Sequence, residues 1–175
     1  EEYLDGLLHS VEGGSPADTA RETEPGDTAD GLYAEKEQIQ KIFCDGRKFS
    51  GTVGIYMSKG DTHRGGRSVA KVELDNGTIL YYKPHSLDKN IKYQELYNYL
   101  CRKTGISCRT VQYLSHDSYG WEEKIENIPC KNESEVEHYY FRMGIHLFLG
   151  YALGATDLHG ENIIAHGEYP VIIDM

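Results

Sequence analysis

The sequence has 175 residues, a formal net charge of −10 and 39% hydrophobic residues, which suits one modest soluble core. The absence of any long uninterrupted apolar window excludes a membrane span, and the start lacks the pattern of a secretory signal. Residues 1–37 hold eleven acidic and two basic side chains, so the rest is near neutral and offers no basic surface for nucleic acid. The four cysteines form no Cys-x-x-Cys pair, which indicates free thiols in a reducing cytoplasm.

Along the chain, a polar segment precedes alternating helix and strand patterns. Because residues 10–31 are rich in Gly, Pro, Ser, Thr and acidic residues, we expect residues 1–31 to be an acidic, disordered arm or insertion and residues 32–175 to be a partial domain. Helices are predicted over 32–44, 88–103 and 134–153, and strands over 51–57, 69–74, 79–83, 111–114, 121–125, 162–165 and 171–173. The Asn76-Gly77 pair predicts a hairpin, and the apolar run 141–153 predicts a mostly buried helix. This order is typical of an α+β, protein/lipid-kinase-like fold, with a small lobe of antiparallel sheet plus helix and the beginning of the large lobe.

The segments TDLHGEN (156–162) and VIID (171–174) have the spacing of a kinase catalytic loop and its metal-binding strand. Asp157 and Asn162 lie five positions apart, and Asp174 follows Asn162 by twelve positions across a predicted short hairpin. In this pattern Asp157 accepts or orients the proton of an acceptor hydroxyl. Asn162 and Asp174 supply the oxygen ligands that suit Mg²⁺ bound with ATP.

Lys83 ends the second strand of the Asn-Gly hairpin, where a kinase places the lysine that contacts the nucleotide phosphates. The next predicted helix offers Glu95 as a carboxylate to pair with this lysine. An exposed, solvated position on the helix explains Glu95 equally well.

The glycine-rich turn GDTHRGGR (60–67) occupies the place of a phosphate-covering loop, although it is not a G-x-G-x-x-G sequence. Its arginines suit phosphate, and Asp61 beside His63 could serve acid–base chemistry. An ordinary turn is the alternative interpretation.

Four segments in this order, GDTHRGGRSV, YYKPHSL, YGWEEKI and TDLHGENIIAHGEYPVIID, resemble the successive motifs of the dehydratase domain of class II (LanM-type) lanthipeptide, or lantibiotic, synthetases. The resemblance implies ATP-dependent phosphorylation of Ser and Thr in a ribosomal precursor peptide, followed by phosphate elimination to dehydroalanine or dehydrobutyrine. It implies that Lys83 contacts the nucleotide, that Asp157, His159 and Asn162 form the catalytic loop, and that Asp174 binds the metal. By the same resemblance, Asp61 and His63 take part in elimination. A hydrogen-bonded histidine that shapes the loop is the alternative for His159.

The family pattern continues beyond Met175, and its members carry a separate zinc-bearing cyclase domain. We therefore expect this chain to be a fragment of a longer enzyme, inactive or marginally folded by itself. Two alternatives use the same residues differently: another kinase-like phosphotransferase, or a degenerate kinase-like module that binds a leader peptide. The order of Asp before His in the loop differs from that of protein kinases and favours the dehydratase.

Overall fold

The computed structural model describes residues 25–57, 68–156 and 158–175, which form two compact units. The first, here called the sheet unit, contains described residues 25–57, 68–88 and 111–124. The second, here called the hairpin unit, contains described residues 89–110, 125–156 and 158–175. No helix in the described part of the chain has both the length and the apolar character needed to cross a membrane.

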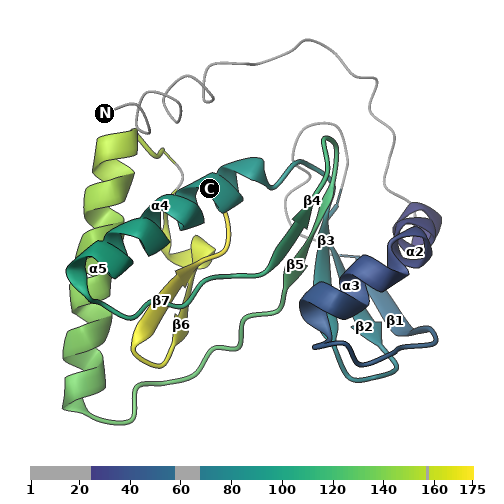
Figure 1. The fold of residues 1–175 in the computed structure, drawn as a ribbon, viewed down its shortest axis with the longest axis horizontal. Coiled ribbons are helices and arrows are strands. Elements are labelled where there is room, and N and C mark those ends of the chain that lie inside the picture. The colour runs from purple at the N-terminus through teal and green to yellow at the C-terminus, as the bar shows by residue number, and fades with distance from the viewer. Residues whose placement is uncertain (1–24, 58–67, 157) are drawn as a thin grey trace. The chain divides into compact units, whose positions relative to one another are not determined.

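The sheet unit is built on a five-stranded antiparallel sheet in the order β1-β2-β3-β5-β4 (Figure 1). Its strands are β1 (Thr52–Met57), β2 (Ala70–Leu74), β3 (Ile79–Lys83), β4 (Tyr113–Ser115) and β5 (Gly120–Glu123). The predicted hairpin between β2 and β3 is confirmed, and Gly77 has the positive φ of 85° that its turn requires. Because β5 lies between β3 and β4, the end of β3 is flanked by residues from β5.

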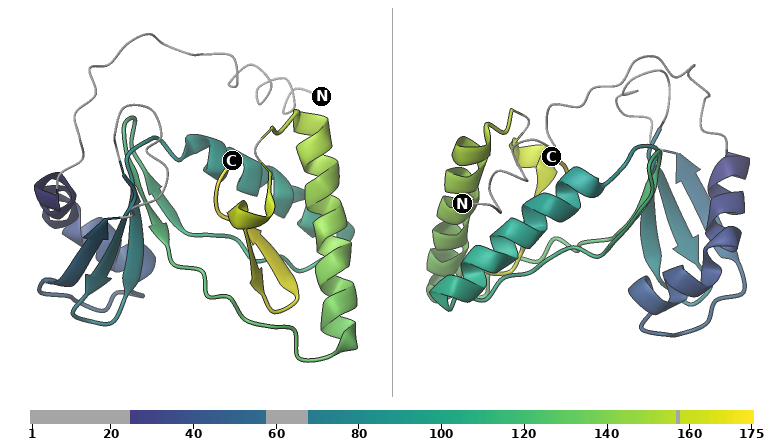
Figure 2. Two further views of the ribbon diagram at one scale, coloured as in Figure 1. Left: turned by 180° about the vertical axis from the view of Figure 1, so that it is seen from behind. Right: turned by 45° about the horizontal axis from the view of Figure 1, so that its top comes forward.

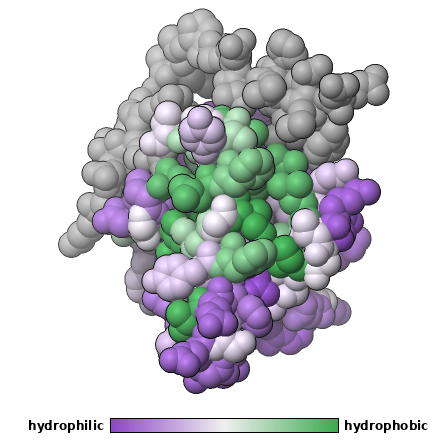
Figure 3. Space-filling model, turned by 90° about the vertical axis from the view of Figure 1, so that its left-hand side faces the viewer, coloured by the Kyte–Doolittle hydropathy of each residue, from purple (hydrophilic) through white to green (hydrophobic). Residues whose placement is uncertain are grey.

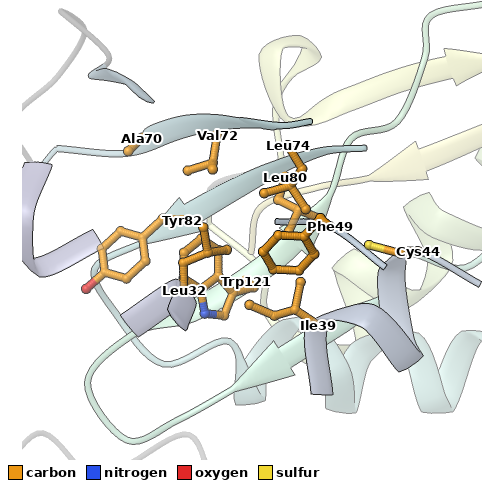
Figure 4. Packing of buried hydrophobic residues seen from close by; sticks show 10 residues of the cluster. All are labelled: Leu32, Ile39, Cys44, Phe49, Ala70, Val72, Leu74, Leu80, Tyr82 and Trp121. Carbon is orange, nitrogen blue, oxygen red and sulfur yellow. The ribbon is translucent and has the colours of Figure 1, made fainter. Parts of the chain in front are cut away.

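Helices α2 (Pro25–Ala34) and α3 (Lys36–Phe43) pack against one face of this sheet (Figure 2). Figure 4 shows Leu32 of α2 and Ile39 of α3 against side chains that alternate along the strands. The buried cluster comprises Leu32, Ile39, Cys44, Phe49, Ala70, Val72, Leu74, Leu80, Tyr82 and Trp121. Burial of each large apolar side chain contributes about 1.5–3 kcal/mol. The intervening strand residues, such as Lys71, Glu73 and Lys83, point to the opposite, polar face.

The helix at the start of the described chain corrects the boundary expected at residue 31. Residues 25–31 belong to α2, and Thr28 is fully buried together with Leu32, one turn further on. Because this stretch is mostly polar, its composition predicted disorder and did not indicate the few positions that face the core. Residues 1–24 lie outside the described part of the chain.

The hairpin unit contains two helices, a short 3₁₀ turn and a two-stranded hairpin. They are α4 (Asp88–Thr104, whose first residue belongs to the sheet unit), α5 (Glu133–Leu153), η1 (Gly160–Asn162), β6 (Ile163–His166) and β7 (Tyr169–Ile172). The side chain of Asn132 caps α5 by accepting the Glu135 N–H at 3.0 Å, and Gly154 ends α5 with a φ of 65°. Both ends of α5 therefore agree with the prediction.

The side chains that α5 buries differ from expectation. Arg142, His146 and Leu149 are buried, whereas Leu147, Phe148 and Tyr151 are exposed by 69%, 62% and 89%. Figure 3, which views the side of the molecule where α5 lies, shows apolar side chains gathered at the surface. The prediction that the run 141–153 is mostly buried is therefore wrong, because only the face of α5 directed at β7 and α4 is covered in this unit.

Candidate functional site

In the sheet unit, Lys83 is a buried cation with a carboxylate partner. Its Nζ lies 2.9 Å from Oε2 of Glu122, and the two side chains are only 7% and 3% exposed. Lys83 pairs across the ladder with Gly120, so Glu122, two residues further along β5, lies diagonally opposite on the same face. The lysine is thus held at the end of β3 by a residue of the adjacent strand.

The chain that follows Lys83 folds back against the same strand. A Cβ on Gly120 would lie 2.6 Å from Cδ1 of Leu87, so only glycine leaves room for this buried leucine. The Leu87 N–H donates to Oγ of Ser115 at 2.9 Å, and that hydroxyl donates to Asp88 at 2.8 Å. These contacts fix the segment between Lys83 and the start of α4.

Glu95 belongs to the hairpin unit, whereas Lys83 belongs to the sheet unit. Glu95 lies on α4 and pairs with Lys92 of the same helix at 3.2 Å, with both side chains about half exposed. An exposed i,i+3 pair of this kind contributes little to stability. Within the hairpin unit Glu95 has a solvated setting, and its pairing with Lys83 stays a prediction. Within the sheet unit the partner of Lys83 is Glu122.

In the hairpin unit, Asn162 and Asp174 lie at the same end of the β6–β7 hairpin. The Ile173 N–H donates to the Asn162 carbonyl at 3.0 Å, which continues the strand pairing beyond β6 and β7. The Ile173 carbonyl accepts from the side chain of Asn90 on α4 at 3.3 Å. Both backbone groups of Ile173 are thus bonded immediately before Asp174, whose Oδ1 accepts the Met175 N–H at 3.1 Å.

A buried imidazole supports β7 from α5. His146 lies 2.6 Å from the Tyr93 hydroxyl through Nδ1 and 3.1 Å from the Pro170 carbonyl through Nε2, and it stacks on Tyr97. Because a carbonyl only accepts, Nε2 carries the proton and Nδ1 accepts from Tyr93. Burial lowers the pKa of His146 to about 4, so the ring is neutral near pH 7.

A buried guanidinium holds the turn of the same hairpin. Arg142 donates to the carbonyl and hydroxyl of Ser107 at 2.9 and 2.8 Å, and to the carbonyl and carboxylate of Glu168 at 3.2 and 2.9 Å. Desolvation acts to raise the pKa of Glu168, but the bonds and charges of Arg142 and His138 lower it overall. Arg142 also stacks over the ring of Tyr169. The hairpin that carries Asn162 and Asp174 is thereby fastened at its far end as well.

His159 lies at the start of η1, where its Nδ1 accepts the Glu161 N–H at 3.3 Å. Its Nε2 lies 3.4 Å from the side-chain amide of Asn162. These contacts fit the histidine that shapes the loop, and they also place the ring beside a predicted metal ligand. Asp157, Asp61 and His63 lie outside the described residues.

The donor atoms at the hairpin end fit a magnesium ion bound with a nucleotide. Asn162 and Asp174 offer an amide oxygen and a carboxylate, and Mg²⁺ uses few protein ligands because water and phosphate oxygens complete its octahedron. No cluster of three or more His, Cys, Asp or Glu residues suited to a metal occurs among the residues that the structure describes. The four cysteines, all within the described part, are free thiols.

Three polar residues near the predicted site have roles that the sequence interpretation did not assign. Glu122 stands in the motif YGWEEKI between Trp121 and Glu123, and no local sequence signal marks it as buried. Arg142 and His146 lie four residues apart in an apolar helix, and this spacing signals one shared face.

The sequence is similar to that of a protein described as "Lacticin 481/lactococcin biosynthesis protein LcnDR2" from Lactococcus lactis subsp. lactis. The two are 34% identical over 133 residues, which is 71% of this chain. The matched region spans 14% of the relative's length.

A family described as "Domain of unknown function (DUF4135)" matches residues 26–175. The match begins one residue after the start of α2 and includes every described strand and helix that positions Lys83, Asn162 and Asp174. Since it accounts for most of the sequence, the chain belongs to the DUF4135 family.

Proposed function

We propose that the chain is the nucleotide-binding part of a kinase-like peptide dehydratase of lanthipeptide biosynthesis. The observation that carries the proposal is the Ile173–Asn162 hydrogen bond, which brings Asn162 and Asp174 to one end of a hairpin. Two oxygen donors at that position suit the Mg²⁺ of Mg-ATP. The printed name of the relative from Lactococcus lactis, a lacticin 481/lactococcin biosynthesis protein, supports the pathway.

The first reaction transfers a phosphoryl group to the precursor peptide. The hydroxyl oxygen of a Ser or Thr forms a bond to the γ-phosphorus of ATP, while the bond from that phosphorus to the bridging oxygen breaks and releases ADP. Asp157 accepts the hydroxyl proton, and Lys83 contacts the nucleotide phosphates. When bound, Mg²⁺ neutralises charge on those phosphates; Asn162 and Asp174 would hold it.

The second reaction eliminates the phosphate. A base removes the α-proton of the phosphorylated residue, a carbon–carbon double bond forms, and the phosphate leaves from the β-carbon. Asp61 and His63 are assigned to this step. The net change is loss of water from the Ser or Thr at the expense of one ATP, which gives dehydroalanine or dehydrobutyrine.

Mass spectrometry of the precursor peptide tests this function. The natural full-length protein is incubated with Mg-ATP and the peptide encoded beside its gene, and the peptide mass is followed with time. We expect a phosphorylated intermediate followed by loss of water. Lys83→Met should slow the first step by roughly 100-fold or more, because it removes a preorganised charge beside the phosphates. Lys71→Met, which removes a half-exposed lysine of the same sheet face, is the matched control and should retain activity.

Variants of the two steps separate the alternatives. Asp157→Asn should abolish phosphorylation and retain ATP binding, and His63→Ala should let the phosphopeptide accumulate. Stable phosphorylation by the unmodified protein would identify a phosphotransferase instead. An unchanged peptide together with undetectable ATP binding would identify a peptide-binding module.

A further inference from the structure

The environment of Lys83 contains a carboxylate from a strand. Glu122 belongs to β5, which is flanked by β3 and β4, and its Oε2 lies 2.9 Å from Lys83 Nζ. Backbone hydrogen bonds on both sides hold β5, so the carboxylate has a fixed base. The distance from Lys83 to a carboxylate on a helix outside the sheet would instead depend on where that helix packs.

A second lysine–glutamate pair on the same sheet face provides a comparison. Lys71 and Glu73 lie 2.6 Å apart on β2, but their side chains are 36% and 28% exposed, so water screens their attraction. Lys83 and Glu122 are almost completely removed from water. Burial of two charges incurs a desolvation cost that commonly cancels their attraction, so stability alone does not account for this pair.

The surroundings of the buried pair are shaped to preserve it. Gly120, which pairs with Lys83 across the ladder and precedes Glu122 by two residues along β5, leaves space for Leu87. Leu87 is fully buried, and its N–H is bonded to Ser115 of β4. The backbone on either side of the ion pair is therefore fixed by packing and hydrogen bonds, as expected of side chains that must keep one geometry.

We propose that Glu122 is the positioning residue for the nucleotide-contacting lysine: it holds the Lys83 ammonium at the end of β3, directed for contact with a nucleoside triphosphate. This inference rests on the proposed function. A flexible lysine loses side-chain entropy when it binds phosphate, and a partner that orders it beforehand reduces that loss. Glu122 thus supplies, from within the sheet unit itself, a carboxylate that orders this lysine.

A double-mutant cycle on nucleotide affinity tests the inference. The dissociation constant of Mg-ATP is measured by calorimetry for the natural full-length protein and for Glu122→Gln, Lys83→Met and the double variant. We expect Glu122→Gln to weaken binding roughly tenfold when Lys83 is present, and to have no further effect in the Lys83→Met background. Glu73→Gln, which breaks the exposed pair, should leave the affinity unchanged.

The outcomes distinguish positioning from a general structural role. If Glu122→Gln weakens ATP binding equally with and without Lys83, or in neither background, the inference is overturned. If Lys83→Met alone still weakens ATP binding in that case, the proposed function is upheld. Absence of ATP binding, or binding that ignores Lys83, overturns the proposed function and this inference with it. If the Gln variant does not fold, Glu122→Asp is used in the same cycle; it retains the charge but withdraws it by one methylene, and a smaller loss that depends on Lys83 is expected.

Discussion

Acid should destabilise the hairpin unit through His146, and the contacts of this residue allow the size of the effect to be worked out. The ring is buried among Tyr93, Tyr97 and the Pro170 carbonyl. Protonation would put a second donor on Nδ1, opposite the Tyr93 hydroxyl that now donates to it, and would charge a buried group. Burial raises the pKa of Tyr93, so this phenol remains a donor over the whole acidic range.

The pKa of His146 falls from 6.5 to about 4 on folding, so the unfolded chain takes up this proton more readily between these two pH values. Stability is therefore fully retained above pH 6.5, declines as the pH falls through this window, and levels off below about pH 4. The shift corresponds to about 3 kcal/mol when complete. Between pH 7 and pH 5 the loss is about 2 kcal/mol.

Urea unfolding at pH 7 and pH 5 measures this loss. Fluorescence of Trp121 reports the unfolding of the sheet unit, and circular dichroism also reports the helices of the hairpin unit. His146→Gln removes the titrating group, so the variant should lose about 2 kcal/mol less than the unmodified chain between these pH values. His85→Gln removes an exposed imidazole and should leave the acid sensitivity unchanged. Equal acid sensitivity of His146→Gln and the unmodified chain would refute the reasoning.

Other substitutions test the remaining contacts by the same urea measurement. Arg142→Met should cost about 3 kcal/mol because it leaves the Ser107 and Glu168 carbonyls without this donor and leaves the Glu168 carboxylate with His138 alone of these two partners. Arg142→Lys should lose most of this stability too, and near-normal stability of either variant would contradict the role given to Arg142. Leu32→Ala should cost about 2–5 kcal/mol if α2 belongs to the core, whereas a surface helix would tolerate it. Gly120→Ala should cost about 1–3 kcal/mol by displacing Leu87, and Leu87→Ala in the same chain should recover part of that loss; additive losses would place the strain elsewhere.

The local elements could be predicted because their signals are local. The Asn76-Gly77 turn, the Asn132 cap and the Gly154 stop each act within a few residues of the structure they specify. The start of α2 was missed because its core contacts are few and widely spaced among polar residues. The exposed face of α5 was missed because an apolar sequence reports what a helix can bury, while the neighbours present decide what it does bury.

Among the site residues too, the features set by nearby sequence could be predicted and those set by distant strand pairing could not. The spacing of Asn162 and Asp174 predicted a hairpin between them, and β6 pairs with β7 as expected. The partner of Lys83 could not be predicted, because it depends on β5 pairing with β3 across a long connection. Its place on the next helix made Glu95 a candidate, and that pairing stays a prediction, whereas strand order brings Glu122 to the lysine.

The register of β3 against β5 links the core of the sheet unit to its polar site. Leu80 and Tyr82 point into the core beside Trp121, and this fixes Lys83 on the opposite face. A slip of one residue would turn Lys83 into the apolar cluster and move Glu122 out of its reach. The slipped sheet would therefore lose buried apolar area and would also bury an unpaired charge. The aromatic contact between Tyr82 and Trp121, with ring centroids 5.2 Å apart, favours the observed register. The apolar face of the sheet therefore determines the geometry of the ion pair on the polar face, and a substitution in the core that allowed slippage would disable the site without touching it.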